Sequence, residues 1–302
     1  TGTRGGGVYT EHSTVEVKDS KIDGNTATDV PLGDPYSNKG LGGGIYSYDS
    51  TLTVTDSTIS GNEAKGSNAL IKYNDENGEL SSAALGNGGG GICAVGKKSD
   101  VTLDGVTVTG NKATYSASSK KGTGAGIEAQ GGTLTVTECT ITNNEARGNG
   151  GGIYSAEGNV LNVSDSTIQG NTSNNGGGIH MGEAIDNSKT PSKATITDTK
   201  ILNNKTSGDS LSSGEGGGVY VGTRADATLK DCIVAGNEAA NNGGGIYASC
   251  STITLDRTTV ENNKAAVNGG GLSHWGIAVP GSLTLQNGSI IRNNTASSMG
   301  GG

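Results

Sequence analysis

The chain has 302 residues, of which 31% are hydrophobic, 55 are glycine and none is phenylalanine, so a large globular core is not expected. The net charge of −8 argues against a nucleic-acid partner, because phosphate groups attract a basic surface. No apolar run approaches the ~18 residues of a membrane-spanning helix, and we expect no membrane insertion by this segment.

A repeated unit organises the chain. A spacing of 26 residues, as between Gly150 and Gly176, or of up to 47, as between Gly42 and Gly89, indicates a stacked array within one elongated body. We therefore predict a single β-helix domain over 1–302, and we expect a segment of a longer chain because it starts and stops inside a repeat. Glycine triplets, or Gly-Ala-Gly, begin at Gly5, Gly42, Gly89, Gly124, Gly150, Gly176, Gly216, Gly243, Gly269 and Gly300.

The unit at 42–62 shows which strands each repeat contains. Ile45 follows the glycines, and the apolar residues of the stretch 51–55 (TLTVT) then alternate with threonine, which predicts a strand with one buried face. After Asp56 the phase changes, so we expect a corner there. The pattern predicts three short strands per unit, around Ile45, Leu52–Val54 and Ser57–Ile59. About nine such units predict an all-β, right-handed parallel β-helix, since parallel crossovers are right-handed.

Each unit closes with Ile-x-x-Asn or Val-x-x-Asn, the last reading Ile290 to Asn293. Amides stacked ~4.8 Å apart can hydrogen-bond along a column, and we favour such a structural ladder over a ligand-binding role. The closing asparagines are Asn25, Asn62, Asn111, Asn144, Asn171, Asn204, Asn237, Asn263 and Asn293.

These motifs carry a family resemblance. GGGIY followed by IxxN resembles the paired GGA[ILV] and FxxN repeats of the chlamydial polymorphic outer-membrane proteins and of other bacterial β-helix surface proteins. The match extends over all nine units, although Gly usually replaces Ala, and Ile or Val replaces every Phe. The resemblance implies a secreted or surface-displayed, autotransporter-like passenger with an adhesive role.

Insertions separate some of the units. Four of them, at 26–41, 63–88, 112–123 and 205–215, follow a closing asparagine, and one, at 181–192, lies at a second corner. Insertions on one side of a repeat array often form its binding face. We therefore expect these loops to present contacts.

Polysaccharide lyases and pectin hydrolases also use β-helices, so catalytic patterns need consideration. A calcium-dependent lyase requires converging carboxylates and a base, whereas this chain places one acid per unit at a corner, where turn chemistry favours Asp. No Ser/His/Asp or His/Cys arrangement is visible. We predict no catalytic residue, no metal and no cofactor. The corner acids are Asp19, Asp56, Glu138, Asp165, Asp198 and Asp231.

One outward column of the first predicted strand contains Tyr154, His180, Tyr220 and Tyr247. Such a stripe can stack on sugars or anchor a partner protein. It can equally cover the sheet by packing between neighbouring rungs. A third interpretation, His180 as a catalytic base, lacks partner residues in the pattern.

The sequence favours a non-catalytic, extracellular, adhesin-like solenoid at the bacterial cell surface. Its expected partners are a protein or glycan of a host or neighbouring cell, together with end-to-end self-association into a filament, because open strand edges favour pairing. The alternative is a polysaccharide lyase or glycoside hydrolase of the pectin-lyase-like class. The four cysteines are expected to be free thiols.

Overall fold

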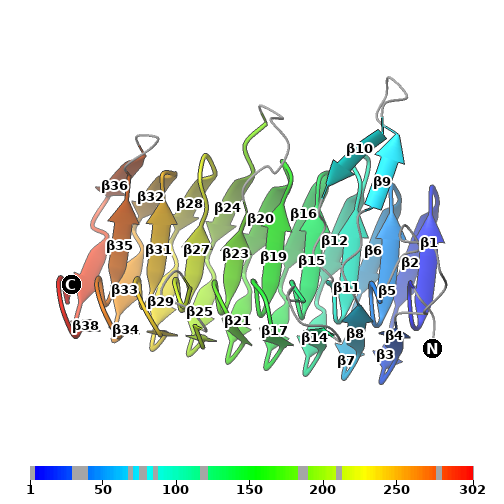
Figure 1. Cartoon of the computed structure of the whole chain (residues 1–302), viewed down its shortest axis with the longest axis horizontal. Coiled ribbons are helices and arrows are strands. Elements are labelled where there is room, and N and C mark those ends of the chain that lie inside the picture. Colours follow the sequence, from blue (N-terminus) through cyan, green and yellow to red (C-terminus); the bar gives the residue numbers. More distant parts are fainter. Residues whose placement is uncertain are drawn as a thin grey trace.

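A computed structural model describes residues 4–28, 40–66, 71–74, 80–83, 88–115, 122–182, 190–208, 213–276 and 281–301. The regular elements of these residues are all β-strands, and all but two belong to four parallel sheets of nine strands each. The strands of each sheet stack side by side along the long axis of the molecule, and the two chain ends lie at its opposite ends (Figure 1).

The first two sheets follow the glycines. The first sheet contains β1 (Val8–Glu11), β5 (Ile45–Tyr48), β11 (Ile92–Val95), β15 (Ile127–Gln130), β19 (Ile153–Ala156), β23 (Ile179–Met181), β27 (Val219–Val221), β31 (Ile246–Ser249) and β35 (Leu272–Trp275). The second sheet contains β2 (Thr14–Lys18), β6 (Thr51–Thr55), β12 (Asp100–Asp104), β16 (Thr133–Thr137), β20 (Val160–Ser164), β24 (Lys193–Thr197), β28 (Asp226–Lys230), β32 (Thr252–Asp256) and β36 (Ser282–Gln286).

The last two sheets lie on either side of the closing asparagines. The third sheet contains β3 (Lys21–Asp23), β7 (Thr58–Ser60), β13 (Thr107–Thr109), β17 (Thr140–Thr142), β21 (Thr167–Gln169), β25 (Lys200–Leu202), β29 (Ile233–Ala235), β33 (Thr259–Glu261) and β37 (Ile290–Arg292). The fourth sheet contains β4 (Thr26–Thr28), β8 (Glu63–Gly66), β14 (Lys112–Tyr115), β18 (Glu145–Ala146), β22 (Thr172–Ser173), β26 (Lys205–Thr206), β30 (Glu238–Ala239), β34 (Lys264–Ala265) and β38 (Thr295–Ala296).

The chain passes through the sheets once per repeat, so that each repeat is one rung of a parallel β-helix. Equivalent residues pair in register from rung to rung, as Leu134 does with Val101 and with Leu161. The three predicted strands per rung and the nine rungs are confirmed. The structure adds a fourth, shorter strand after each closing asparagine.

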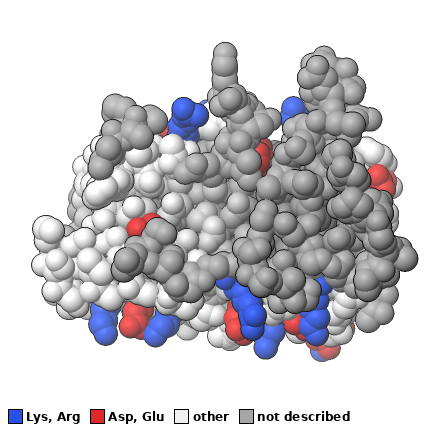
Figure 2. All heavy atoms as spheres, viewed as in Figure 1, with Lys and Arg blue, Asp and Glu red and all other residues white. Residues whose placement is uncertain are grey.

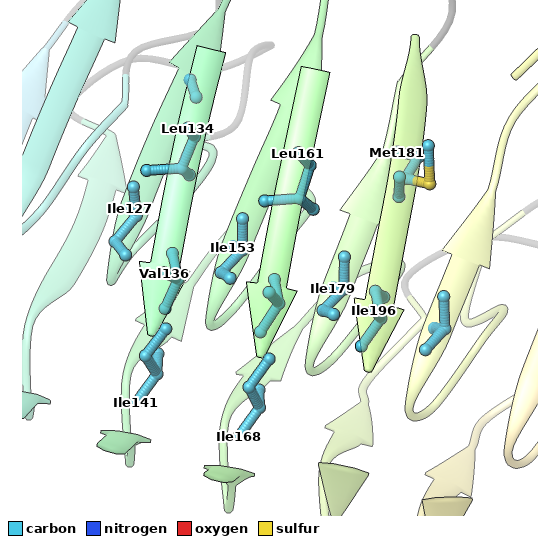
Figure 3. Packing of buried hydrophobic residues seen from close by; sticks show 14 of the residues in the cluster. Ile127, Leu134, Val136, Ile141, Ile153, Leu161, Ile168, Ile179, Met181 and Ile196 are labelled. Carbon is cyan, nitrogen blue, oxygen red and sulfur yellow. The ribbon is translucent and has the colours of Figure 1, made fainter. Parts of the chain in front are cut away.

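The hydrophobic core is a set of columns along the inside of the coil. In one rung Ile127, Leu134, Val136 and Ile141 are fully buried, and their equivalents in the next rung pack directly against them (Figure 3). Because strands repeat every ~4.8 Å, each side chain contacts its own equivalents above and below. Alternation along 133–137 therefore places Leu134 and Val136 inside and the threonines outside.

The glycine triplets allow the rungs to approach each other closely. Gly150 has a positive φ of 68°, and a Cβ added to Gly152 would lie 2.6 Å from the Gly178 carbonyl oxygen and 3.1 Å from Asn171 Nδ2. Any larger residue at the third glycine would push the coil away from both the next rung and the closing asparagine. The two motifs of the repeat thus pack against each other.

The last rung corrects one prediction. Asn287 and Gly288 both have positive φ and form a two-residue turn between β36 and β37. This extra residue shifts the following strand by one position, so that Ile291, and not Ile290, pairs with Val260. Ile290 points outward and is 44% exposed. The predicted placement of Ile290 and Asn293 in their columns was therefore wrong by one residue.

The insertion boundaries also need correction. The fourth strand takes up the first residues of the predicted insertions 26–41, 63–88, 112–123 and 205–215, which accordingly begin later. Met181, the first residue of the predicted insertion 181–192, ends β23. Within 63–88, β9 (Ile71–Asn74) and β10 (Leu80–Ala83) form an antiparallel pair. Most of the remaining insertion residues lie outside the described residues.

Candidate functional site

The closing asparagines form a continuous hydrogen-bonded column. Asn62 donates its backbone N–H and its Nδ2 to Asn111 Oδ1, both at 3.0 Å, and its Nδ2 also donates to the Ile22 carbonyl at 2.9 Å. The same pattern continues from Asn25 through Asn171 to Asn263. At the last rung Asn263 donates to Asn294 Oδ1, so Asn294 takes the place predicted for Asn293.

These amides are satisfied within the fold. Asn62, Asn111, Asn144, Asn171, Asn204 and Asn237 have no exposed surface. The left-handed residue of this corner is the one before the ladder asparagine, such as Asn143 before Asn144 or Gly170 before Asn171. Buried amides that are fully hydrogen-bonded have little capacity left for a ligand. The ladder geometry accordingly supports a structural role.

The predicted stripe is a stack of rings. Tyr154 and His180 have ring centroids 5.3 Å apart, His180 and Tyr220 4.3 Å, and Tyr220 and Tyr247 5.4 Å, with interplanar angles of 14°, 4° and 26°. Each ring face between neighbours is covered by the next ring. This arrangement corresponds to packing between rungs, the second interpretation of the pattern.

The stripe is also less accessible than an outward column suggests. His180 is only 5% exposed and Tyr247 7%. Burial lowers the pKa of His180 to about 3, although a backbone hydrogen bond involving Asn175 opposes the shift. Its Nδ1 has no hydrogen-bond partner among the described residues. A ring with so low a pKa is a weak base at neutral pH.

The same outward column contains a buried carboxyl group that the sequence reading did not single out. Glu128 is 1% exposed; it accepts hydrogen bonds from Thr123 Oγ1, at 3.0 Å, and from Gln130 Nε2. A Cβ on Gly88 would lie 1.0 Å from Glu128 Oε2, so only glycine leaves room for this carboxyl. Burial raises the pKa of Glu128 to about 8. The sequence signal was a charged residue in a column of otherwise aromatic or uncharged residues.

The carboxyl group and the imidazole of this column are not neighbours. Cys93 pairs in register with Glu128, Glu128 with Tyr154, and Tyr154 with His180. A tyrosine therefore separates the carboxyl group from the imidazole. Burial raises the pKa of the Cys93 thiol well above its usual value, which disfavours the nucleophilic thiolate. All four cysteines are buried, and none forms a disulfide.

The corner acids serve as turn residues. Asp56, Glu138 and Asp165 adopt left-handed backbone conformations with φ between 47° and 52°, and the other three acids of the column do so with φ between 46° and 54°. Arg257 occupies the same place in its rung, with φ of 47°, and its Nε donates to Asp231 Oδ1 at 2.6 Å. The Arg257 guanidinium holds the pKa of Asp231 below its usual value. This pairing was not predicted from the sequence.

Among the residues that the structure describes, no three His, Cys, Asp or Glu side chains lie where they could together hold a metal ion. The described residues also contain no helix that is long and apolar enough to cross a membrane.

Comparison with known families gives two matches. The family described as "Right handed beta helix region" matches residues 6–214, which is more than half of the chain. The family described as "Chlamydia polymorphic membrane protein (Chlamydia_PMP) repeat" matches residues 231–249, one β-helix segment that contains β29, β30 and β31. Comparisons with curated proteins and with solved structures gave no significant match.

Proposed function

The chain belongs to the family of right-handed β-helix regions, and we propose that it is the non-catalytic, rod-shaped part of a bacterial surface protein. In this role it resembles an autotransporter passenger, which holds binding loops away from the cell. The partner is a protein or a glycan on a host or neighbouring cell. The observation that carries the proposal is the continuous stacking of nine rungs, because a stiff shaft of fixed register suits display.

The use of the polar side chains supports a structural role. The asparagines hydrogen-bond to each other, the corner acids hold left-handed turns, and the aromatic stripe packs ring against ring. The asparagines and the aromatic rings thus contact their equivalents in the next rung, and Asp231 of the corner acids pairs with Arg257. A catalytic site usually requires groups whose surroundings are arranged for reaction and not for stacking.

The position of the chain at the cell surface rests on the repeat. Residues 231–249 match a repeat of the Chlamydia polymorphic membrane protein, whose name associates that protein with a membrane. By analogy we propose secretion and surface display for this chain. Adhesion follows from the same analogy and from the long insertions between rungs.

Binding can be tested directly. Labelled protein would be applied to cultured epithelial cells and to a glycan array, beside a variant in which 65–87 is replaced by Arg-Gly, the pair at 147–148 of a rung without an insertion. This leaves five residues between Asn62 and Gly89, as between Asn144 and Gly150. We expect binding by the parent chain and a clear loss in the variant, with unchanged circular dichroism. A second variant, in which Tyr154, Tyr220 and Tyr247 are all replaced by Ser, tests separately whether the aromatic stripe contributes to binding. Absence of binding to any cell or glycan would contradict an adhesive role.

Polysaccharide cleavage is the alternative that this fold class leaves open. Incubation with uronate polysaccharides, with and without calcium, would reveal it through unsaturated products. We expect none. Turnover that disappears when Asp165 and Asp198 are both replaced by Asn would overturn the non-catalytic proposal.

A further inference from the structure

The first residues of the strands in the fourth sheet form a column of alternating charge, here called the charged ridge. These residues are in register from rung to rung. In rung order they are Thr26, Glu63, Lys112, Glu145, Thr172, Lys205, Glu238, Lys264 and Thr295.

The charged ridge is at the surface. The side chains of Lys112, Glu145, Lys205 and Lys264 are 54–63% exposed and that of Glu238 is 42% exposed, whereas that of Glu63 is 24% exposed and pairs with Lys65. Acidic and basic side chains gather along one edge of the molecule, the lower edge in Figure 2. Neighbouring rungs already pair within the chain, as Lys205 Nζ lies 3.0 Å and Lys264 Nζ 3.7 Å from the Glu238 carboxylate.

The order of the charges has an unusual symmetry. When the order of the ridge residues is reversed and compared with the original order, every acid is matched with a base and every base with an acid. Glu63 comes opposite Lys264, Lys112 opposite Glu238, and Glu145 opposite Lys205. The threonines come opposite threonines, with Thr172 at the centre opposite itself.

We propose that the charged ridge is a self-recognition surface on which a second copy of this chain docks antiparallel and side by side. A two-fold axis beside Thr172 generates this arrangement, and the interface is isologous, as in most homodimers. The rungs of both copies repeat every ~4.8 Å, so all the opposite charges come into register at once. Six intermolecular ion pairs form, two for each of the three pairings.

A second copy fits this surface better than other partners. The ridge contains three acids and three bases, so it offers no net charge to a nucleic acid or an anionic membrane. The next outward positions do not oppose the pairing, since Lys65 comes opposite Ala266 and Arg147 opposite Ser207. Like charges placed opposite one another would exclude a parallel two-fold pairing along the same ridge.

Charge-reversal variants of the full chain test the proposal. One variant reverses the first half (E63K, K112E and E145K) and a second reverses the other half (K205E, E238K and K264E). Each keeps alternating charge along its own ridge, so the pairs between neighbouring ridge residues are kept. E63K alone gives up a pair, the one between Glu63 and Lys65 Nζ at 2.9 Å. In homodimers of either variant, however, like charges come opposite. An equimolar mixture of the two restores opposite charges at every position.

Analytical ultracentrifugation would measure the association. We expect the parent chain to dimerise at about 50 mM salt, with a dissociation constant at least about tenfold weaker at about 500 mM, because exposed ion pairs are screened. Each half-reversed variant should lose at least about tenfold in affinity, the mixture should recover it, and a variant with all six charges reversed should dimerise as the parent does. A parent that stays monomeric at low salt, half-reversed variants that associate like the parent, or a mixture that fails to recover would each overturn the proposal.

A cross-link tests the register independently of the charges. Thr172→Cys places a thiol beside its own equivalent, and we expect a disulfide-linked dimer on mild oxidation. Thr135→Cys, on the outer face of the second sheet, is the matched control, and the four native cysteines are buried. Equal cross-linking of the two variants would exclude the antiparallel ridge. If the chains assembled end to end instead, Thr172→Cys would form no disulfide-linked dimer, and this result would also overturn the proposal.

Discussion

Glu128 shows how one buried group can make the stability of the rod depend on pH. Its pKa in the folded chain is about 8, whereas an unfolded glutamate titrates near its ordinary value of about 4.3. The folded state thus binds the proton more tightly, and the stability present below pH ~4.3 is lost as the pH rises to ~8. The loss is about 1.4 kcal/mol per pH unit within that window.

Replacing Glu128 by Gln should remove this dependence. Thr123 and Gln130 can still hydrogen-bond to the amide, and no charge is buried. We expect the variant to gain stability over the parent as the pH rises from 4.5 to 8, by a few kcal/mol in total, on the order expected for a shift of this size. Urea unfolding across this range measures it. Parallel pH profiles for the two proteins would refute the buried-carboxyl explanation.

His180 should make the stability of the folded chain depend on pH in the opposite direction. Its folded pKa of about 3 lies below the ordinary value of about 6.5, so the stability present above pH 6.5 is lost as the pH falls towards 3. Tyr at this position keeps the stack between Tyr154 and Tyr220 and does not titrate in this range. We predict that His180→Tyr flattens the acid side of the stability profile, measured as melting temperature against pH. If the melting temperature of the variant fell at acid pH as steeply as that of the parent, the burial of a neutral imidazole would be contradicted.

At the residue scale, the sequence correctly predicted the direction of the stripe but not its burial. Alternation along a strand shows which side chains share a face. It contains no information on what covers that face. The burial of His180 and of Glu128, and the matching space at Gly88, depend on packing between residues distant in the chain.

At the scale of the element, the asparagine column is the contact most sensitive to change. In Asn171→Ala, the backbone N–H and Nδ2 of Asn144 lose their acceptor, and the Ile141 carbonyl loses a donor. Unpaired buried polar groups are costly, so we predict a loss of on the order of 3 kcal/mol. Asn162→Ala, on the outer face of β20, is the matched control and should change stability by less than about 0.5 kcal/mol. Equal effects of the two substitutions in chemical unfolding would contradict the ladder.

The strands with long alternation were predictable, and the shortest ones were not. In the fourth sheet a strand such as β18 or β34 has two residues, with Ala146 or Ala265 as its only inward side chain. Two residues give no periodicity, and alanine is a weak indicator of a strand. The shift in the last rung was missed for a related reason. Asn287–Gly288 is a typical turn sequence, but its residue types do not show whether the turn takes one residue or two.

At the scale of the molecule, stability should vary along the rod. Leu134 and Val136 have no exposed surface, whereas their equivalents Leu283 and Leu285 in the last rung are 38% and 44% exposed. Rungs that are covered on one side only lose part of the interface between neighbours, which supplies much of the stability of a solenoid. We predict that, in a protein made of residues 1–302 alone, amide hydrogen exchange is slowest in the central rungs and faster in the first and last rungs. Uniform protection along the chain in mass spectrometry would contradict this prediction.

The rung at 150–175 has no insertion, and it shows how the length of the rod can change by one whole repeat. Asn149 and Asn175 are bridged as equivalents, so the backbone enters Gly150 and Gly176 in the same way. Excising these 26 residues would join Asn149 to Gly176 and shorten the rod by one step of about 4.8 Å, with every column closing on its next equivalent. Duplication or deletion of whole units in the gene would therefore lengthen or shorten the rod in steps of about 4.8 Å without a change in any column.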